Sequence, residues 1–194
     1  GSRGLGDVYK RQDMADLEAK LKEAQAAGAR TIMIATDGVF SMDGYIANVP
    51  ELRRLADEYD ALLMMDDCHS TGILGPEGKG TAAHFGLQVD ILTSTLGKSL
   101  VGAAGGFVAA AQPVIDMLRQ RSRPYLFSNA LPPAIIGGAL EAIKLTRNGD
   151  DLRTRLQANA AHFRAGLSAA GFNLLDGQHP IIPVMLGEGQ LAQD

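Results

Sequence analysis

The sequence predicts an α/β fold in which a mainly parallel sheet lies between helices. Short apolar segments of strand length alternate along the chain with segments of helical periodicity, and strands buried on both faces have such continuous apolar runs. Glycine is also over-represented, at 23 of 194 residues, which suits the many tight turns of a chain that alternates strands and helices.

The composition is that of an ordinary soluble globular protein and argues against several functions. Apolar residues make up 46% and charged residues 21%, and the length suits one domain or slightly more. The formal charge of −4 disfavours nucleic acid as a partner, because nucleic-acid-binding proteins usually carry a basic excess. The single cysteine, Cys68, excludes an internal disulfide framework. No apolar run reaches the roughly 20 residues of a membrane span, so we expect no membrane partner.

The first half of the chain predicts one helix and then four buried strands. The helix runs over residues 13–28, with Asp13 as N-cap and Gly28 as stop. The strands lie at residues 31–36, 61–65, 89–93 and 106–110, each short and apolar. Two further helices start at Pro50 and near Pro113, since proline is tolerated in a first helical turn.

The pattern changes after residues 125–129. A helix rich in small residues is predicted at 131–145 and a long amphipathic helix at 150–170, followed by short strands at 172–175 and 181–186. The turn Asn148-Gly149-Asp150 is the best candidate for a domain boundary.

Polar side chains follow three consecutive predicted strands, and they are the candidates for chemistry. Ser41 follows the first strand, Asp66 and His69 the second, and Thr95 and Lys98 the third. Because parallel sheets place ligands at the carboxyl ends of their strands, we expect these groups to converge. Lys98 stands out because the residues after it are too small and too apolar for a typical exposed face.

Each of these residues also has a structural interpretation. Asp66 and Asp67 are equally suited to cap a turn, and a lone histidine such as His69 is more often a satisfied structural residue. The Asp-Asp-Cys-His sequence at 66–69 is too compressed for a tetrahedral structural zinc site, and we predict no metal. Cys68 is interpreted as a packed small residue.

Together the candidates suit pyridoxal 5′-phosphate (PLP). A lysine amine must lose its proton to attack the PLP aldehyde, and burial favours that loss. The pyridine ring accepts electrons best when its nitrogen is protonated, which requires a buried carboxylate. A histidine can bind the ring hydroxyl, and a hydroxyl such as that of Thr95 can hold the phosphate.

Four segments resemble one family in particular. They are TDGVFSMDG (36–44), DDCHSTGILGPEGKG (66–80), TSTLGKSLVGAAGG (93–106) and RQRSRPYLFSNALPPAI (119–135). These resemble the α-oxoamine synthases, which are PLP-dependent acyltransferases of fold type I. The resemblance implies that Lys98 forms the Schiff base with PLP and later acts as general base, that Asp66 pairs with the pyridinium nitrogen, and that His69 contacts the ring hydroxyl.

The same resemblance implies the rest of the site and its partners. Ser41 and Thr95 would bind the cofactor, and Ser128 and Asn129 match positions where a partner subunit reaches into the neighbouring site, so we expect a homodimer. The implied substrates are glycine and acetyl-CoA, joined to give 2-amino-3-oxobutanoate and CoA. The alternatives are other family members with different acyl-CoA or amino-acid partners, or an inactive truncated product.

The resemblance also implies a domain organisation. Family members are considerably longer, so we expect a fragment that lacks a ring-stacking histidine and a carboxylate-binding arginine. Residues 1–12 are expected to be a non-native leader, 13–148 part of the PLP-binding large domain, and 149–194 the start of a smaller C-terminal α+β domain. The expected location is the bacterial cytoplasm or the mitochondrion.

Overall fold

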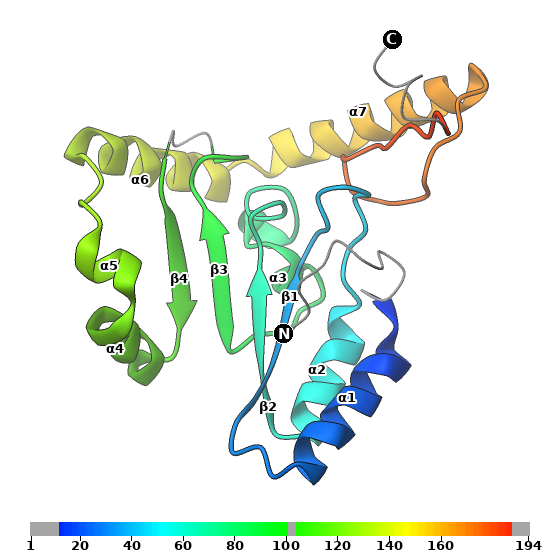
Figure 1. The fold of residues 1–194 in the computed structure, drawn as a ribbon. Helices are drawn as coiled ribbons and strands as arrows, with labels where there is room; N and C mark the ends of the chain where they lie inside the picture. Colours follow the sequence, from blue (N-terminus) through cyan, green and yellow to red (C-terminus); the bar gives the residue numbers. More distant parts are fainter. Residues whose placement is uncertain (1–11, 101–103, 188–194) are drawn as a thin grey trace.

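The protein is built around a four-stranded sheet (Figure 1). The computed structural model describes residues 12–100 and 104–187, so the predicted leader lies outside the described residues except for Gln12. The strands are β1 (Ile32–Asp37), β2 (Ala61–Asp66), β3 (Ile91–Thr95) and β4 (Gly106–Ala110), in that spatial order. All four predicted strands are confirmed.

The sheet is mixed, because β4 runs antiparallel to β3 whereas β1, β2 and β3 are parallel. The sequence interpretation does not distinguish the direction of β4. The connection between β3 and β4 spans only residues 96–105, and a parallel crossover needs about a dozen residues or more. The chain therefore returns directly beside β3.

Helices α1 (Met14–Ala26) and α2 (Val49–Glu58) form the main core with β1 and β2. The predicted N-cap of α1 is confirmed, since the Asp13 side chain accepts a hydrogen bond from the backbone N–H of Asp16. Alternate strand residues point toward these helices. The most deeply buried apolar side chains of this core include Leu55, Leu63 and Met65.

The opposite face of the sheet is open between β1 and β2. Met33 is 51% exposed and Leu62 is 38% exposed, although they are neighbours in the parallel register. The predicted sheet between helices is confirmed, but this part of its second face is exposed within the described residues. A continuous apolar run indicates a strand suited to burial on both faces, but it does not specify which segment provides the second cover.

The second half of the chain is mainly helical. After the short helices η2 (Pro76–Gly78) and α3 (Thr81–His84), the later helices are α4 (Gln112–Arg121), α5 (Arg123–Phe127), α6 (Pro133–Arg147) and α7 (Asp150–Ala169). Helices α6 and α7 run across the end of the sheet at which β2 and β3 finish (Figure 1). None of the helices in the described ranges is both long and apolar enough to cross a membrane.

The two strands predicted after α7 are wrong. Only an isolated antiparallel bridge forms, between Leu174 and Val184. Pro183 lies in the second predicted strand and Pro180 directly precedes it, and proline has no N–H to donate to a ladder. The predicted turn at residues 148–150 does separate α6 from α7.

Candidate active site

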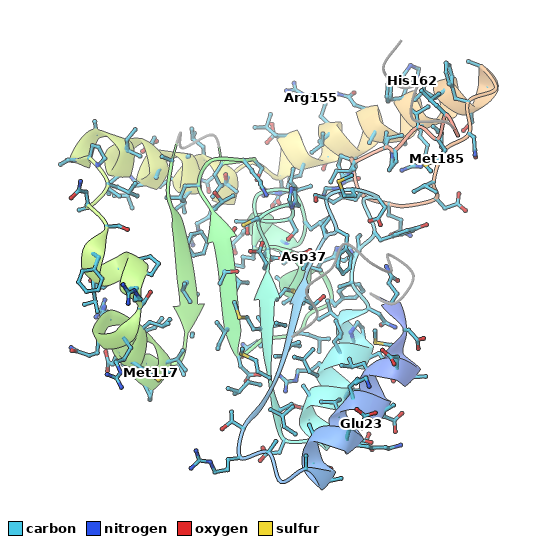
Figure 2. The ribbon with its side chains drawn as sticks, in the orientation of Figure 1. Glu23, Asp37, Met117, Arg155, His162 and Met185 are labelled. Atoms are coloured by element: carbon cyan, nitrogen blue, oxygen red, sulfur yellow. The ribbon has the colours of Figure 1, made fainter. Side chains whose placement is uncertain are left out.

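The carboxyl ends of β1, β2 and β3 lie side by side in one register. Asp66 at the end of β2 pairs with Asp37 of β1 on one side and with Thr93 of β3 on the other. Asp37 is labelled in Figure 2 and marks this edge of the sheet. The described geometry brings three of the predicted site residues, Asp66, His69 and Lys98, to this edge.

The carboxylate of Asp66 is held by hydrogen bonds from both neighbouring segments. Its Oδ1 accepts from the backbone N–H of Cys68 at 2.9 Å, and its Oδ2 accepts from the hydroxyl of Thr93 at 3.1 Å. Burial acts to raise the pKa of Asp66, but these hydrogen bonds and the charge of Lys98 outweigh it and lower the pKa below its ordinary value of 3.8. Asp66 is therefore ionised at neutral pH.

His69 and Lys98 are direct neighbours across the edge of the sheet. The Lys98 Nζ lies 3.0 Å from His69 Nε2 and 3.4 Å from Nδ1. Burial, together with the nearby Lys98 charge, lowers the pKa of His69 below 6.5. The imidazole is therefore mainly neutral at pH 7 and can accept a hydrogen bond from the lysine amine.

Lys98 itself is exposed, so the expectation that it is buried is wrong for the described residues. Leu96 and Leu100 on either side are buried in a small apolar cluster, while the turn between them points outward. The position of the Lys98 amine therefore depends on its polar neighbours, of which His69 lies 3.0 Å away.

Asp67 has a different role from the adjacent Asp66. It is fully buried, and its carboxylate accepts hydrogen bonds from the Ser70 hydroxyl and, at 2.9 Å, from the backbone N–H of Thr81. The backbones of Gly38 and Gly80 approach this carboxylate so closely that a Cβ at either position would collide with it. Of the two aspartates, Asp67 fixes the loop and Asp66 faces the site.

A chain of hydroxyl groups joins the loop of Lys98 to the turn of His69. Ser94 Oγ donates to Thr71 Oγ1 at 2.7 Å, and the Ser99 hydroxyl donates to the Thr71 carbonyl oxygen. The backbone N–H of Thr71 donates in turn to the backbone carbonyl oxygen of Asp67 at 2.9 Å. The sequence interpretation missed these residues, although the hydroxyl-rich stretch around Lys98 was the available signal.

Two predicted cofactor ligands, Ser41 and Thr95, lie near the strand ends, and no described hydrogen bond joins either side chain to Asp66, His69 or Lys98. Ser41 lies exposed in the turn after β1. Thr95 donates to the Gly105 carbonyl at 3.1 Å and accepts from the Gly97 N–H at 3.2 Å. Within the described residues, no hydrogen bond joins either side chain to Lys98, so their roles remain predictions.

Ser128 and Asn129 are exposed and follow α5. Helix α5 lies beyond β4, at the edge of the sheet (Figure 1). No described hydrogen bond links Ser128 or Asn129 to Lys98. Their position leaves the expected role in a neighbouring subunit as a prediction.

Cys68 is a poor nucleophile in this setting. Burial and the neighbouring Asp66 carboxylate raise the pKa of Cys68 to about 11, so the thiol is protonated at neutral pH. Among the described residues, no group of three or more histidine, cysteine or acidic side chains is arranged to hold a metal ion.

The chain matches known proteins over nearly its whole length. The family model "Aminotransferase class I and II" matches residues 7–194. The 2-amino-3-ketobutyrate coenzyme A ligases of Salmonella typhimurium and, in mitochondria, of Mus musculus are 54% and 50% identical over 95% of this chain, which covers 47% and 44% of their lengths. An 8-amino-7-oxononanoate synthase of Treponema denticola is 45% identical over 93% of this chain, covering 46% of that protein.

A solved structure shares the fold. Serine palmitoyltransferase from S. paucimobilis, with a PLP–myriocin adduct bound, superposes with a TM-score of 0.86 and is 32% identical. The match covers 92% of this chain and 47% of that one. The chain thus spans about half the length of the relatives that it matches.

Proposed function

Because the chain belongs to the aminotransferase class I and II family, we propose that it carries the lysine half of the active site of a PLP-dependent acyltransferase. The proposed reaction joins glycine and acetyl-CoA to give 2-amino-3-oxobutanoate and CoA. The observation that carries the proposal is the arrangement of Lys98 3.0 Å from the mainly neutral His69, beside the ionised Asp66.

The donor set at this edge fits PLP. When bound, PLP supplies an aldehyde with which amines condense and a ring that withdraws electrons from an amino-acid α-carbon. Lys98 offers the amine, and Asp66 offers a carboxylate that stays ionised and can hold a protonated ring nitrogen. His69 offers a neutral ring for the hydroxyl of the cofactor. Ser41 and Thr95 are proposed to complete the binding set.

The residues of the chain would act on the substrate through proton transfer and orientation. Lys98 Nζ is proposed to accept the proton that leaves the glycine α-carbon, the step that makes this carbon able to attack the acetyl thioester. His69 holds Nζ in place through their 3.0 Å contact. The buried Asp67 fixes the turn from which Asp66 and His69 project.

The cofactor proposal is tested by trapping. The purified chain is mixed with PLP, its absorbance near the visible edge is recorded, and borohydride is added before peptide mass spectrometry. We expect a stable adduct on Lys98 that disappears in Lys98→Ala. The matched control is Lys79→Ala, which removes another exposed lysine and should leave the adduct intact. A folded chain without an adduct, or an adduct that survives Lys98→Ala, contradicts the proposal.

The choice of acetyl-CoA rests on relatedness. Identity to the 2-amino-3-ketobutyrate ligases reaches 54%, against 45% for the 8-amino-7-oxononanoate synthase. The second candidate is therefore another α-oxoamine synthase, such as an 8-amino-7-oxononanoate or 5-aminolevulinate synthase. The test compares glycine-dependent CoA release from acetyl-, pimeloyl- and succinyl-CoA. It uses a full-length protein, in which this chain is joined to the segments of its relatives that it does not cover. Faster release from pimeloyl- or succinyl-CoA favours the second candidate.

A non-catalytic chain is the remaining alternative, favoured by the exposure of Lys98 and by the open sheet face. It predicts no adduct in the trapping experiment even though the sample is folded.

The bacterial and mitochondrial relatives support a location in the bacterial cytoplasm or the mitochondrion.

We also propose that the active protein is a homodimer in which Ser128 and Asn129 reach the partner's site. The adjacent helix α5 carries the support, because Phe127 is 76% exposed there and apolar surface of this kind suits an interface. Sedimentation at several concentrations should show a dimer that Phe127→Ser weakens. Phe163→Ser, which changes an exposed phenylalanine on α7, is the control. Equal effects of the two substitutions would contradict an interface at α5.

A further inference from the structure

His179 lies in the segment after α7, yet its side chain is buried beside the turn that carries His69. Only 4% of His179 is exposed. Its Nε2 lies 3.0 Å from the carbonyl oxygen of His69, and its Nδ1 lies 3.2 Å from the backbone nitrogen of Ile181. One imidazole therefore bridges two segments that are 110 residues apart in sequence.

The two partners determine which nitrogen carries the proton. The N–H of Ile181 is a donor, so Nδ1 must accept with its lone pair. The carbonyl oxygen of His69 only accepts, so Nε2 must carry the hydrogen. The ring is therefore neutral and in a single tautomer. Burial, which lowers the pKa of His179, favours the same state.

The segment that carries His179 is seated on a second loop as well. Gly44 in the loop after β1 has a φ of +72°, and a Cβ there would lie 2.8 Å from the Ile181 carbonyl oxygen. The backbone around Ile181 is thus held between the Gly44 loop and the imidazole of His179. Because the backbone at Ile181 is held on both sides, the His179 imidazole that bonds to it is also held in one orientation toward His69.

We propose that His179 is a positioning residue, whose Nε2–H fixes the backbone of His69 and thereby holds the His69 ring beside Lys98. The donor reaches the residue whose ring makes the 3.0 Å contact with Lys98 Nζ. The consequence for cofactor binding rests on the proposed function, whereas the effect on His69 does not.

Two substitutions distinguish the bond that His179 makes to His69 from the local bond that it makes to Ile181. In His179→Gln the amide nitrogen reaches about as far as Nε2 and keeps the donor to His69. In His179→Asn the amide oxygen takes the place of Nδ1 and keeps the local bond to Ile181, but the side chain is too short to reach His69. The matched control is His162→Asn, which changes the exposed histidine on α7 labelled in Figure 2.

The first measurement uses the full chain without cofactor. Nitrogen-15 NMR of the histidine rings is expected to show His179 as the neutral Nε2–H tautomer. We expect the His69 ring signals to move in His179→Asn and to stay within the wild-type range in His179→Gln and His162→Asn. A charged or Nδ1–H His179 in the wild-type chain overturns the proposal without any variant, as do equal His69 shifts in the Asn and Gln variants.

The second measurement is the dissociation constant of PLP from absorbance titrations. Loss of one hydrogen bond predicts about a five- to tenfold weaker affinity in His179→Asn and less than about a twofold change in His179→Gln. Equal affinities in these two variants contradict the positioning role. If the wild-type chain binds no PLP while the NMR differences appear as expected, the positioning of His69 stands and the proposed function fails.

Discussion

The hydroxyl of Thr93 donates a hydrogen bond of 3.1 Å to the carboxylate of Asp66 across two adjacent parallel strands. This bond and the one from Cys68 help to keep the pKa of Asp66 low against the effect of burial. The ionised state of the proposed ring-nitrogen partner thus depends in part on the strand that leads to Lys98.

Replacing Thr93 with the similarly shaped valine should raise the pKa of Asp66, because the carboxylate then loses one donor while its burial is unchanged. PLP affinity should fall several-fold, since one hydrogen bond is worth about 1 kcal/mol. Carbon-13 NMR titration of the aspartate carboxyls reports the pKa. Thr154→Val is the control, because the Thr154 hydroxyl donates to the Asp150 carbonyl oxygen within α7. An unchanged Asp66 titration in Thr93→Val would count against this account.

Asp67→Asn should destabilise the fold by about 1–3 kcal/mol. The Ser70 hydroxyl and the Thr81 N–H donate to different oxygens of the buried carboxylate, and an amide has an acceptor oxygen at only one of these two places. Urea unfolding measures the difference. Asp60→Asn changes an exposed aspartate with a positive φ, which asparagine also tolerates, and should cost less than about 0.5 kcal/mol. Similar costs at the two positions would refute the buried role of Asp67.

Gly80→Ala should be more damaging still, by about 3 kcal/mol or more. Gly80 has a φ of +98°, and its Cβ would collide with the Asp67 carboxylate. Gly137→Ala is the matched control, because Gly137 lies within α6 with open space around its Cβ position; it should be neutral or stabilising by up to about 1 kcal/mol. Thermal melts of both variants check the prediction. It fails if Gly80→Ala has the same melting temperature as the wild type.

The stability of the chain should decrease as the pH falls from 7.5 to 5.5. Burial is the largest cause of the lowered pKa of both His179 and His69, and the charge of Lys98 adds to it at His69. The unfolded chain therefore takes up protons first, near the ordinary value of 6.5, and the stabilisation present above that pH is lost below it.

Urea unfolding across this pH range measures the effect. The dependence should be shallower in His179→Gln, which removes one of the two histidines whose pKa is lowered by folding. His162→Gln replaces an exposed histidine and should leave the dependence close to that of the wild type. An unchanged pH dependence in His179→Gln would show that His179 contributes nothing to it.

The sequence predicts most of the fold because local rules determine most of it. The Asp13 cap and the four apolar runs correspond to α1 and the four strands. The direction of β4 depends on the length of its connection and was not predicted. The two expected strands after α7 fail because Pro183 cannot donate to a ladder.

The sequence predicts those parts of the candidate site that lie directly after the strands. The rule that ligands lie at the carboxyl ends of parallel strands brings Asp66, His69 and Lys98 together, as the structure shows. The supporting contacts were missed because their partners are distant in sequence. The Asp67 carboxylate is hydrogen-bonded to Thr81, and His179 to the backbone of His69. The hydrophobic periodicity of a sequence does not predict such pairs.

The antiparallel return of β4 has a consequence for the order in which the site is assembled during folding. The turn of Lys98 closes over the short span of residues 96–105, whereas the contact between His69 and His179 closes a loop of 110 residues. The entropy lost on closing a loop grows with its length, and local contacts form sooner than distant ones. We therefore expect the lysine turn to form early and the His179 contact to be among the last made. The C-terminal segment would then complete a site in which the proposed nucleophile, Lys98, is already in place.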